Sequence, residues 1–418
     1  MVELPDHSDA VLCRIAQDYG TPFYAYSMPD CLRQIAALRE GFRNRFLISY
    51  AVKSNPNPGV VARLRERVDL LDISSGGELK MCLGVGWPAD RLTFTGPGKS
   101  DEELRLAVSS GIGAVIVESV REAERLDRIA AEREIRQPIL LRIAPLKVPR
   151  GFGVRMAGKP CQFGIDEEVM DDAVRHVRRL KCVRLDGFHI YAGTQCLAVD
   201  ALSENFSNYM SIFRRICDTH DITPASLVFG TGIGIPHHAG DVSVDLEPVA
   251  ESTVPEVDAM RSVKRFANTG FILESGRFLI GEAGTYVVSV VSIKNSRGAR
   301  IVICDGGMNQ HLAACGHFGT VVHRNYRIRR LRRDATPVPP LLNPVDLVGP
   351  LCTSIDTLGH NVELPELDPG DLIAVSASGA YGLSASPMHF ISHTPPREIL
   401  IEQDASGGIE LHDVSQYR

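Results

Sequence analysis

The 418-residue sequence lacks the features that mark several special classes of protein. Its formal net charge of -6 at pH 7 provides no excess of basic residues for a nucleic-acid-binding surface. No apolar run approaches the roughly 20 residues of a membrane-spanning helix. The segment Met1 to Asp6 has neither a basic region nor an apolar signal core. We therefore expect a cytoplasmic protein with no nucleic acid or membrane partner.

Paired cysteines are also missing. The ten cysteines are scattered singly along the chain, and no two of them form a Cys-x-x-Cys pair. Zinc sites and disulfide frameworks place cysteines at short, regular spacings. The sequence therefore predicts no metal site and no disulfide framework, and we expect most of the thiols to be small buried hydrophobic groups.

The sequence that is present has the composition of an ordinary soluble protein, with 44% hydrophobic and 23% charged residues, and its length suggests two domains. From residue 25 to residue 275, short apolar runs alternate with helical patterns such as 78–83, 101–110, 120–132 and 168–179. The predicted strands are residues 46–52, 70–73, 92–95, 114–117, 139–143, 184–191, 226–229 and 271–273. Eight strands separated by helices predict an α/β fold, a closed (β/α)8 TIM barrel.

The pattern changes after about residue 275, where strand-like segments are joined by Pro- and Gly-rich turns with little helix. The segments are residues 285–293, 300–304, 320–326, 345–348, 371–376 and 398–402. We expect residues 276–418 to form a mainly antiparallel β domain together with residues 1–24, which include a helical pattern at 9–20.

The most informative stretch runs from Phe46 to Pro58. An apolar run that ends at Val52 predicts a buried strand, and Lys53 follows it directly, before a turn. The amine of Lys53 would then lie at the carboxyl end of a barrel strand, where the catalytic loops of such barrels gather. A lysine desolvated there can form a Schiff base with a carbonyl cofactor. On this stretch alone, a surface lysine at a strand end is the open alternative.

Three further motifs coincide with predicted strands. The loop from Gly230 to Pro236 can close backbone N–H groups around a phosphate, although glycine-rich turns are common. Glu274 and Arg277 offer a carboxylate and a guanidinium at a strand end, or form a local salt bridge. His189 lies within an apolar strand, where a satisfied core histidine is the alternative. Together with Lys53, these groups on one barrel rim indicate a pyridoxal phosphate pocket.

The motifs resemble those of the fold type III, alanine-racemase-like decarboxylases that use pyridoxal phosphate, the family of diaminopimelate, ornithine and arginine decarboxylases. The resemblance runs from about residue 21 to about residue 396. It rests on Tyr50-Ala-Val-Lys53, Asp72-Ile-Ser-Ser-Gly-Gly-Glu78, His189-Ile-Tyr-Ala-Gly-Thr194, Gly230 to Pro236, Glu274-Ser-Gly-Arg277, Asp305-Gly-Gly307, Gly349-Pro-Leu-Cys352 and Gly379-Ala-Tyr-Gly-Leu-Ser384. It implies a homodimer whose active sites are completed by the neighbouring subunit.

The resemblance also implies a role for each matching residue. Lys53 would hold the cofactor, His189 would stack on its ring, and Glu274 would bond the pyridine nitrogen. The pocket wall near Lys53 would be supported by Asp72 and Glu78. The phosphate would be held by Thr194, Gly232, Gly234, Arg277 and Tyr381.

The residues implied at the substrate are Cys352, Thr353 and Asp356. Cys352 would enter the partner subunit's site as the acid that protonates the α carbon. The residue after this cysteine is usually acidic in the family and grips the distal end of the substrate, but here it is Thr353. The family's Arg-Pro-Ala-Leu-Tyr segment after Asp-Gly-Gly is replaced by residues 308–315. A distal cation on the substrate would therefore lose its natural partner.

Other segments resemble the branch that includes the glutamyl-acyl-carrier-protein decarboxylase of butirosin biosynthesis, and related branches serve siderophore assembly. These segments are Gln162-Phe-Gly164, His189 to Gln195, Cys352-Thr353 and Ser386-Pro-Met-His-Phe390. The implied function is a decarboxylase of secondary metabolism that acts on an amino acid or a carrier-tethered aminoacyl conjugate. The alternatives are a free diaminopimelate-, ornithine- or lysine-type decarboxylase, an amino-acid racemase and a non-catalytic regulator.

Residues 147–162 follow neither the helix nor the strand period, and they predict either a lid over the site or a disordered loop.

An acidic acyl carrier protein or its phosphopantetheine has two candidate contact surfaces, and a solvated charged surface is the alternative for each. The first surface comprises Lys147, Arg150, Arg155 and Lys159, and the second comprises Arg324, Arg327, Arg329, Arg330, Arg332 and Arg333.

Overall fold

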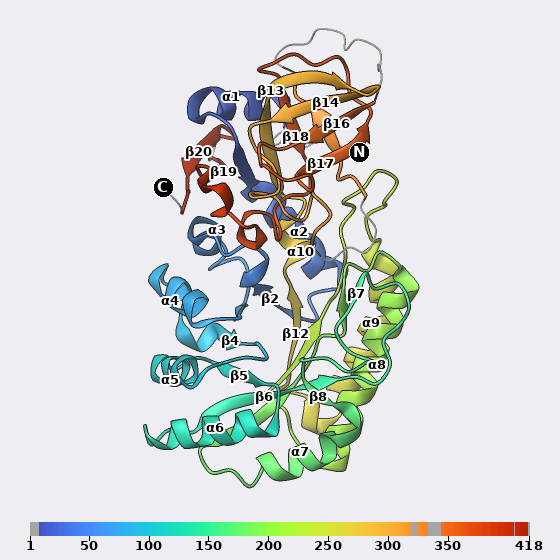
Figure 1. Ribbon diagram of the computed structural model, residues 1–418. Coiled ribbons are helices and arrows are strands. Elements are labelled where there is room, and N and C mark those ends of the chain that lie inside the picture. Colours follow the sequence, from blue (N-terminus) through green and yellow to red (C-terminus); the bar gives the residue numbers. More distant parts are fainter. Residues whose placement is uncertain (1–7, 319–323, 333–343, 405, 417–418) are drawn as a thin grey trace.

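The computed structural model shows a closed barrel with a β domain stacked on one of its ends (Figure 1). The structure describes residues 8–318, 324–332, 344–404 and 406–416. The barrel occupies the lower part of Figure 1, and the β domain lies above it. The predicted fold class is confirmed.

The barrel contains eight parallel strands in the ring order β2-β3-β4-β5-β6-β9-β11-β12, and the pair β12–β2 closes the ring. They are β2 (Leu47–Ala51), β3 (Leu70–Ile73), β4 (Leu92–Phe94), β5 (Ala114–Val117), β6 (Gln137–Ala144), β9 (Val183–Ile190), β11 (Ser226–Gly230) and β12 (Gly270–Ser275). All eight predicted strands are confirmed. Their carboxyl ends meet at one rim because every pair in the ring is parallel.

Helices cover the outside of the barrel (Figure 1). They are α2 (Met28–Gly41), α3 (Pro58–Arg63), α4 (Gly76–Gly84), α5 (Asp101–Ser110), α6 (Val120–Ala131), α7 (Met170–Val177), α8 (Val199–Thr219) and α9 (Leu246–Arg261). Several begin at a serine whose hydroxyl accepts a first-turn N–H bond, as Ser75 does for α4 and Ser119 for α6. At α5, Ser100 and Glu103 form a complete capping box. These caps explain why the helix starts follow from the sequence.

The β domain is built on a nine-stranded, mainly antiparallel sheet in which only the pairs β1–β19 and β14–β16 of the described chain are parallel. Its strands are β1 (Phe23–Ser27), β13 (Gly284–Ser296), β14 (Ala299–Cys304), β15 (Ile328–Arg330), β16 (Val345–Val348), β17 (Thr357–Val362), β18 (Leu372–Val375), β19 (Arg397–Gln403) and β20 (Ile409–Asp413). The helix α1 (Asp9–Tyr19) packs on this domain through Val11, Leu12 and Ile15.

Not every strand of the β domain was predicted. The predicted segment 320–326 lies largely outside the described residues, and its described residue Tyr326 makes only an isolated bridge with His238. The strands β15, β17 and β20 were not expected. The strand β1 pairs with both β13 and β19, so the expected domain division at residue 25 falls inside a strand of the β domain. The division at residues 25 and 275 itself stays a prediction.

The β domain is fixed to the barrel at the rim that carries Lys53. The backbone N–H of Tyr381 donates to the carbonyl of Ser54 at 2.8 Å. The side-chain amide of Asn55 donates to the carbonyl of Gly379 at 3.0 Å. These bonds place the loop after β18 directly against the turn that holds Lys53.

All ten cysteines are free thiols, and six of them are buried, as expected for small hydrophobic groups. Within the described ranges, no helix has both the length and the apolar character needed to cross a membrane.

Candidate functional site

The site centres on Lys53, which lies in a short turn, Val52–Ser54, immediately after β2. Its Nζ is 3.3 Å from Asp72 Oδ2 and 3.7 Å from Glu274 Oε1. The Lys53 side chain is 35% exposed, whereas both carboxylates are buried. Burial disfavours the charged amine, but the negative charges of Asp72 and Glu274 outweigh it and raise the pKa of Lys53. The free amine is therefore protonated at neutral pH.

Asp72 lies next to the end of β3 and supports Lys53 from the neighbouring strand. Its Oδ1 accepts hydrogen bonds from the hydroxyls of Thr95 at 2.5 Å and Thr93 at 3.2 Å. Burial and the nearby charge of Glu274 raise the pKa of Asp72. Its neighbour in the predicted wall, Glu78, accepts from the backbone N–H of Ser74 at 2.6 Å.

His189 on β9 and Glu274 on β12 form a buried pair, with 2.9 Å between Nε2 and Oε2. Although burial opposes ionisation of Glu274, its electrostatic interactions with His189 and Lys53 lower its pKa to about 2. Glu274 is therefore a carboxylate at any physiological pH. The other ring nitrogen of His189, Nδ1, is buried without a hydrogen-bond partner among the described residues.

The glycine loop after β11 forms a cradle that larger residues would fill. Gly232 has a φ of +63°, and a Cβ at this position would lie 2.5 Å from the carbonyl oxygen of Gly193. A Cβ on Gly234 would lie 3.0 Å from the carbonyl carbon of Gln195. The loop is fixed to the neighbouring segment of the same subunit, because the backbone N–H of Cys196 donates to the carbonyl of Gly232 at 3.0 Å. Only residues without side chains leave this space open.

Arg277, Tyr381 and His237 lie together beside this cradle. The guanidinium of Arg277 lies over the ring of Tyr381, with 4.8 Å from Cζ to the ring centroid. Arg277 Nη1 donates to His237 Nε2 at 3.1 Å. Arg277 Nε and His237 Nδ1 are buried without a hydrogen-bond partner within the described chain. Burial, reinforced by the charge of Arg277, holds the pKa of His237 well below its usual value.

The predicted lid, residues 147–162, is a folded segment that packs on the cradle. Its strand β7 (Val154–Arg155) pairs with β10 (Gly193–Thr194). This pair brings Thr194, a predicted phosphate ligand, next to the lid. The ring of Phe152 lies 2.6 Å from where a Cβ on Gly232 would sit.

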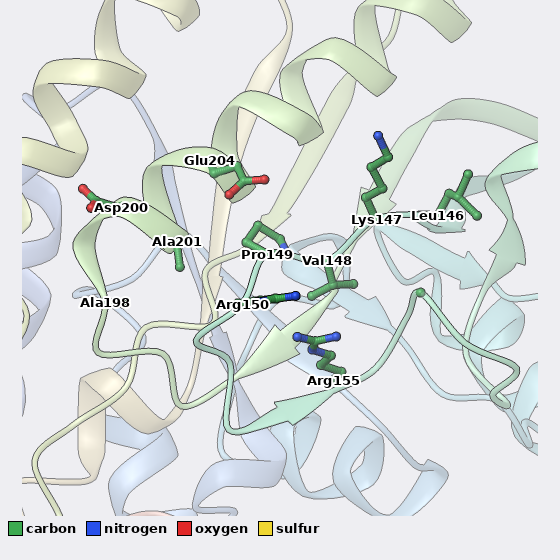
Figure 2. A pocket seen from close by; sticks show the side chains of 11 residues that line it. Leu146, Lys147, Val148, Pro149, Arg150, Arg155, Ala198, Asp200, Ala201 and Glu204 are labelled. Atoms are coloured by element: carbon green, nitrogen blue, oxygen red, sulfur yellow. The ribbon is translucent and has the colours of Figure 1, made fainter.

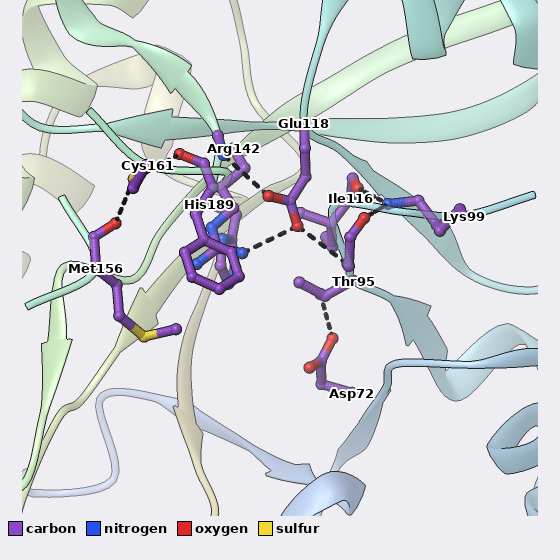
Figure 3. A network of polar contacts seen from close by, with 12 residues as sticks. Asp72, Thr95, Lys99, Ile116, Glu118, Arg142, Met156, Cys161 and His189 are labelled. Atoms are coloured by element: carbon purple, nitrogen blue, oxygen red, sulfur yellow. Dashed lines mark hydrogen bonds and ion pairs between the residues drawn. The ribbon is translucent and has the colours of Figure 1, made fainter. Parts of the chain in front are cut away.

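Glu118 fastens the chain just after the lid to the barrel. Its carboxylate accepts from the backbone N–H of Gly164 at 2.9 Å and pairs with Arg142 at 2.9 Å (Figure 3). Arg142 in turn lies over the ring of Phe163, with 4.7 Å from Cζ to the ring centroid. Both charged groups are almost fully buried, so this pair is costly to break.

The predicted substrate residues lie on a separate loop of the β domain. Cys352 is exposed, and Thr353 is half-buried. Asp356 is 2% exposed, and its two oxygens accept from the backbone N–H groups of Met308 at 2.6 Å and Leu351 at 2.8 Å. In this subunit Asp356 therefore ties two loops together. No contact of the described residues joins Cys352 to Lys53, and the predicted substrate contacts stay predictions.

Three residues of this region were missed from the sequence: Glu118, Arg142 and His237. Glu118 directly follows β5, as Lys53 follows β2, and Arg142 is the only charged residue in the apolar run of β6. Both positions carried a detectable signal. His237 carried none, because its contact with Arg277 exists only in the folded protein.

The arrangement fits pyridoxal phosphate. The open glycine cradle and the unpartnered Nε of Arg277 are suited to a phosphate. The ionised Glu274 is suited to a protonated ring nitrogen, and Lys53 to an aldehyde.

Comparison with known proteins gives the same assignment. The family model described as "Pyridoxal-dependent decarboxylase, pyridoxal binding domain" matches residues 29–281. The chain is 34% identical over 391 residues to the L-glutamyl-[BtrI acyl-carrier protein] decarboxylase of Niallia circulans, covering 94% of this chain and 91% of that protein. It is 28% identical over 388 residues to the 2-[(L-alanin-3-ylcarbamoyl)methyl]-2-hydroxybutanedioate decarboxylase of Staphylococcus aureus, covering 93% and 96%.

Among solved structures, the diaminopimelate decarboxylase of Helicobacter pylori complexed with L-lysine matches with a TM-score of 0.83 at 26% identity, covering 97% of this chain and 96% of that one. The family model alone spans more than half of the 418 residues. The chain therefore belongs to the pyridoxal-dependent decarboxylases, as an alanine-racemase-like enzyme that uses pyridoxal phosphate.

Proposed function

We propose that this enzyme removes the α-carboxylate of an amino acid whose distal end is joined to a larger group by a thioester or an amide. The observation that carries the proposal is the loop from Gly349 to Asp356. Thr353 stands where the resemblance implies that the family usually has a carboxylate, and both oxygens of Asp356 are held by backbone N–H groups. The loop therefore offers no free negative charge to a distal ammonium.

The named relatives support the same substrate class. The Niallia circulans protein acts, by its name, on a glutamyl group carried by an acyl carrier protein. The Staphylococcus aureus protein acts on an alanin-3-ylcarbamoyl compound, in which the amino acid is part of an amide. Neither named substrate has a distal amine on the amino acid. On the same resemblance we place the enzyme in secondary metabolism, and from the sequence we propose a cytoplasmic location.

The residues of the pocket have defined tasks in this reaction. When bound, pyridoxal phosphate supplies the electron sink for the pair left behind by the departing carbon dioxide. Lys53 would hold its aldehyde carbon and yield to the substrate amine. Glu274, kept ionised by His189 and Lys53, would hold a proton on the ring nitrogen. Arg277, Gly232 and the other predicted ligands, Thr194, Gly234 and Tyr381, would hold the phosphate.

Protonation of the α carbon would come from Cys352 of a second copy in a homodimer. Its exposure in the single subunit is compatible with this task, because a residue that serves the neighbouring site must project outward. The main alternative is a decarboxylase of free diaminopimelate, ornithine or lysine, the class to which the Helicobacter pylori structure belongs.

The test compares substrates on the cofactor-loaded enzyme by mass spectrometry. We expect kcat/KM for a glutamyl thioester on an acyl carrier protein to exceed that for free L- or D-glutamate, lysine, ornithine and diaminopimelate by at least about 100-fold. Thr353→Asp should raise kcat/KM for the free diamino acids by about tenfold, because it restores the missing charge partner. Ser354→Asp is the matched control. Faster turnover of a free diamino acid by the wild-type enzyme would refute the proposal.

A further inference from the structure

A cavity of about 560 Å³ lies between the lid and the first two turns of α8. One wall is formed by residues 146–150 with Arg155 and Gly158, and the facing wall carries Asp200 and Glu204 (Figure 2). Its volume is in the range of pockets that bind small organic molecules. Neither the cofactor cradle nor the residues predicted at the substrate belong to its lining.

The cations of this cavity are free. Lys147, Arg150 and Arg155 line it, and all three are exposed. Among the residues that the structure describes, none of their side chains forms an ion pair or a hydrogen bond. Asp200 and Glu204 on the facing wall also have no ion pair within the described chain. The cavity thus has a basic wall that is not neutralised internally.

The second basic surface of the sequence behaves differently. Four of its six arginines are already paired within the protein, Arg332 forms no side-chain ion pair with a described residue, and Arg333 lies outside the described residues. The pairs are Arg324–Asp241, Arg327–Glu282, Arg329–Asp9 and Arg330–Asp371. An anionic ligand would have to compete with these carboxylates. Of the two candidate surfaces, the lid therefore offers the larger unpaired charge, with three cations against one among the described residues.

Lid residues next to the cavity lining also contact the cofactor cradle. Phe152, which follows the cavity residue Arg150 by two positions, lies against Gly232 of the cradle. Arg155 lies opposite Gly193 in the β7–β10 strand pair, and the carbonyl oxygen of Gly193 also borders Gly232. A ligand that fills the cavity is therefore positioned beside the active site without occupying the space for the cofactor phosphate.

We propose that this cavity binds the phosphate of a phosphopantetheine thioester, the arm that would present the amino acid to the active site. The proposal rests on the function proposed above. Arg150 and Arg155 provide planar donor groups that match phosphate oxygens, and Lys147 adds a third positive charge. The carboxylates of Asp200 and Glu204 accept hydrogen bonds from the amide N–H groups of the arm. The same arm occurs on acyl carrier proteins and in coenzyme A.

The first experiment measures binding to the cofactor-loaded enzyme by calorimetry, with 4′-phosphopantetheine and pantetheine as probes. We expect the phosphorylated probe to bind about tenfold more tightly, and the double variant Lys147→Glu, Arg150→Glu to abolish this preference. The control is Arg179→Glu, Lys181→Glu, the same change of charge between α7 and β9, which should leave the preference intact. Equal binding of the two probes by the wild-type enzyme overturns the proposal.

The second experiment measures decarboxylation of one glutamyl group on four thioesters: acyl carrier protein, coenzyme A, phosphopantetheine and N-acetylcysteamine. The double variant Lys147→Glu, Arg150→Glu should raise KM for the three phosphate-bearing substrates by about tenfold without changing kcat. Its KM for the N-acetylcysteamine thioester should equal that of the wild-type enzyme. An equal loss on all four thioesters overturns the cavity assignment. A preference between carrier protein and coenzyme A identifies the source of the arm.

The two proposals fail separately. Suppose that no thioester is decarboxylated, but the wild-type enzyme still prefers phosphopantetheine to pantetheine and the double variant does not. The proposed substrate is then wrong, and the cavity assignment stands. If thioesters are decarboxylated and both probes bind equally, the proposed function stands and the cavity assignment is wrong.

Discussion

His237 accepts a hydrogen bond from Arg277, and the guanidinium of Arg277 lies over the ring of Tyr381. Because burial lowers the pKa of His237, its ring stays neutral and keeps a lone pair for Arg277. A long arginine side chain has many conformations, and this bond removes most of them. His237 is therefore a positioning residue for the predicted phosphate ligand Arg277.

His237→Phe should weaken the binding of pyridoxal phosphate by about tenfold, because Arg277 loses one of its two supports. Pyridoxal without its phosphate should bind as it does to the wild-type protein. Titrations followed by cofactor absorbance measure both affinities. The control is His238→Phe, since His238 contacts the carbonyl of Asn325 and not Arg277. An equal loss for pyridoxal and its phosphate would show that His237 only supports the fold.

His311 makes the stability of the protein depend on pH. Its ring is fully buried, and burial lowers its pKa to about 3. In the unfolded chain the pKa of histidine is about 6.5, so below this pH the unfolded state binds a proton that the folded state does not. The free energy of unfolding therefore falls with falling pH, by about 2 kcal/mol from this group between pH 8 and pH 5.

His311→Asn should reduce the difference in unfolding free energy between pH 8 and pH 5 by about 2 kcal/mol. Denaturant titrations at the two pH values and one protein concentration measure it. The variant also loses the bond to Ser378 at 2.9 Å, which lowers stability at both pH values and cancels in the difference. His389→Asn, at an exposed histidine, should keep the wild-type difference. An unchanged difference in His311→Asn would contradict the argument.

Which site residues the sequence reveals depends on how they are brought together. Lys53 and Glu274 were predictable because each ends an apolar run, and parallel strands bring such ends to one rim. The bond of His237 to Arg277 depends instead on the path of an irregular loop, which has no period to read. The sequence predicted where the chemistry lies but not which neighbours support it.

At the scale of elements, the cradle and the lid constrain each other. A side chain at Gly232 would meet the carbonyl of Gly193 from β10 and the ring of Phe152 from the lid. Since β10 is itself paired with β7 of the lid, a displaced cradle also displaces the lid. Two separate segments, β10 and the lid, thus leave no room for a side chain at Gly232.

Gly232→Ala should lower the free energy of unfolding by about 2–3 kcal/mol and weaken pyridoxal phosphate binding by at least about tenfold. The positive φ and the contacts with Gly193 and Phe152 both contribute. Gly240→Ala isolates the effect of the positive φ, because Gly240 has a φ of +84° and a Cβ there would meet nothing within 4 Å. The control should lose only about 1 kcal/mol and no cofactor affinity. Similar losses in both variants would mean that the close contacts do not matter.

Strands differed in how readily they could be predicted. Those of the barrel are short apolar runs buried on both faces, and all eight were found. In contrast, β17 contains Gly359, His360 and Asn361, and β20 alternates weakly at an edge of its sheet. Such strands are defined by their neighbours more than by their own residues. Predictions of the β domain from the sequence were therefore incomplete.

At the scale of the whole molecule, the proposed homodimer makes a clear prediction. Lys53→Ala and Cys352→Ala each damage one half of a shared site, so each variant alone should be nearly inactive. Mixed in equal amounts and allowed to exchange subunits, they should recover about 25% of wild-type activity, because half of the dimers contain one intact site. The recovered activity is measured after refolding the mixture. No recovery would mean that Lys53 and Cys352 act within one subunit.

The inner strand β1 of the β domain also has a consequence for biosynthesis. Both partners of β1, Phe23–Ser27, belong to segments made after the entire barrel: β13 begins at Gly284 and β19 at Arg397. About 370 residues separate Ser27 from Arg397, which at ~5–20 residues per second is on the order of 20–70 seconds of translation. Until β13 has been made, both hydrogen-bonding edges of the strand are open, and the edge that pairs with β19 stays open for the whole interval. Chaperone capture of the nascent chain is therefore expected at this strand, and the β domain matures only when synthesis is almost finished.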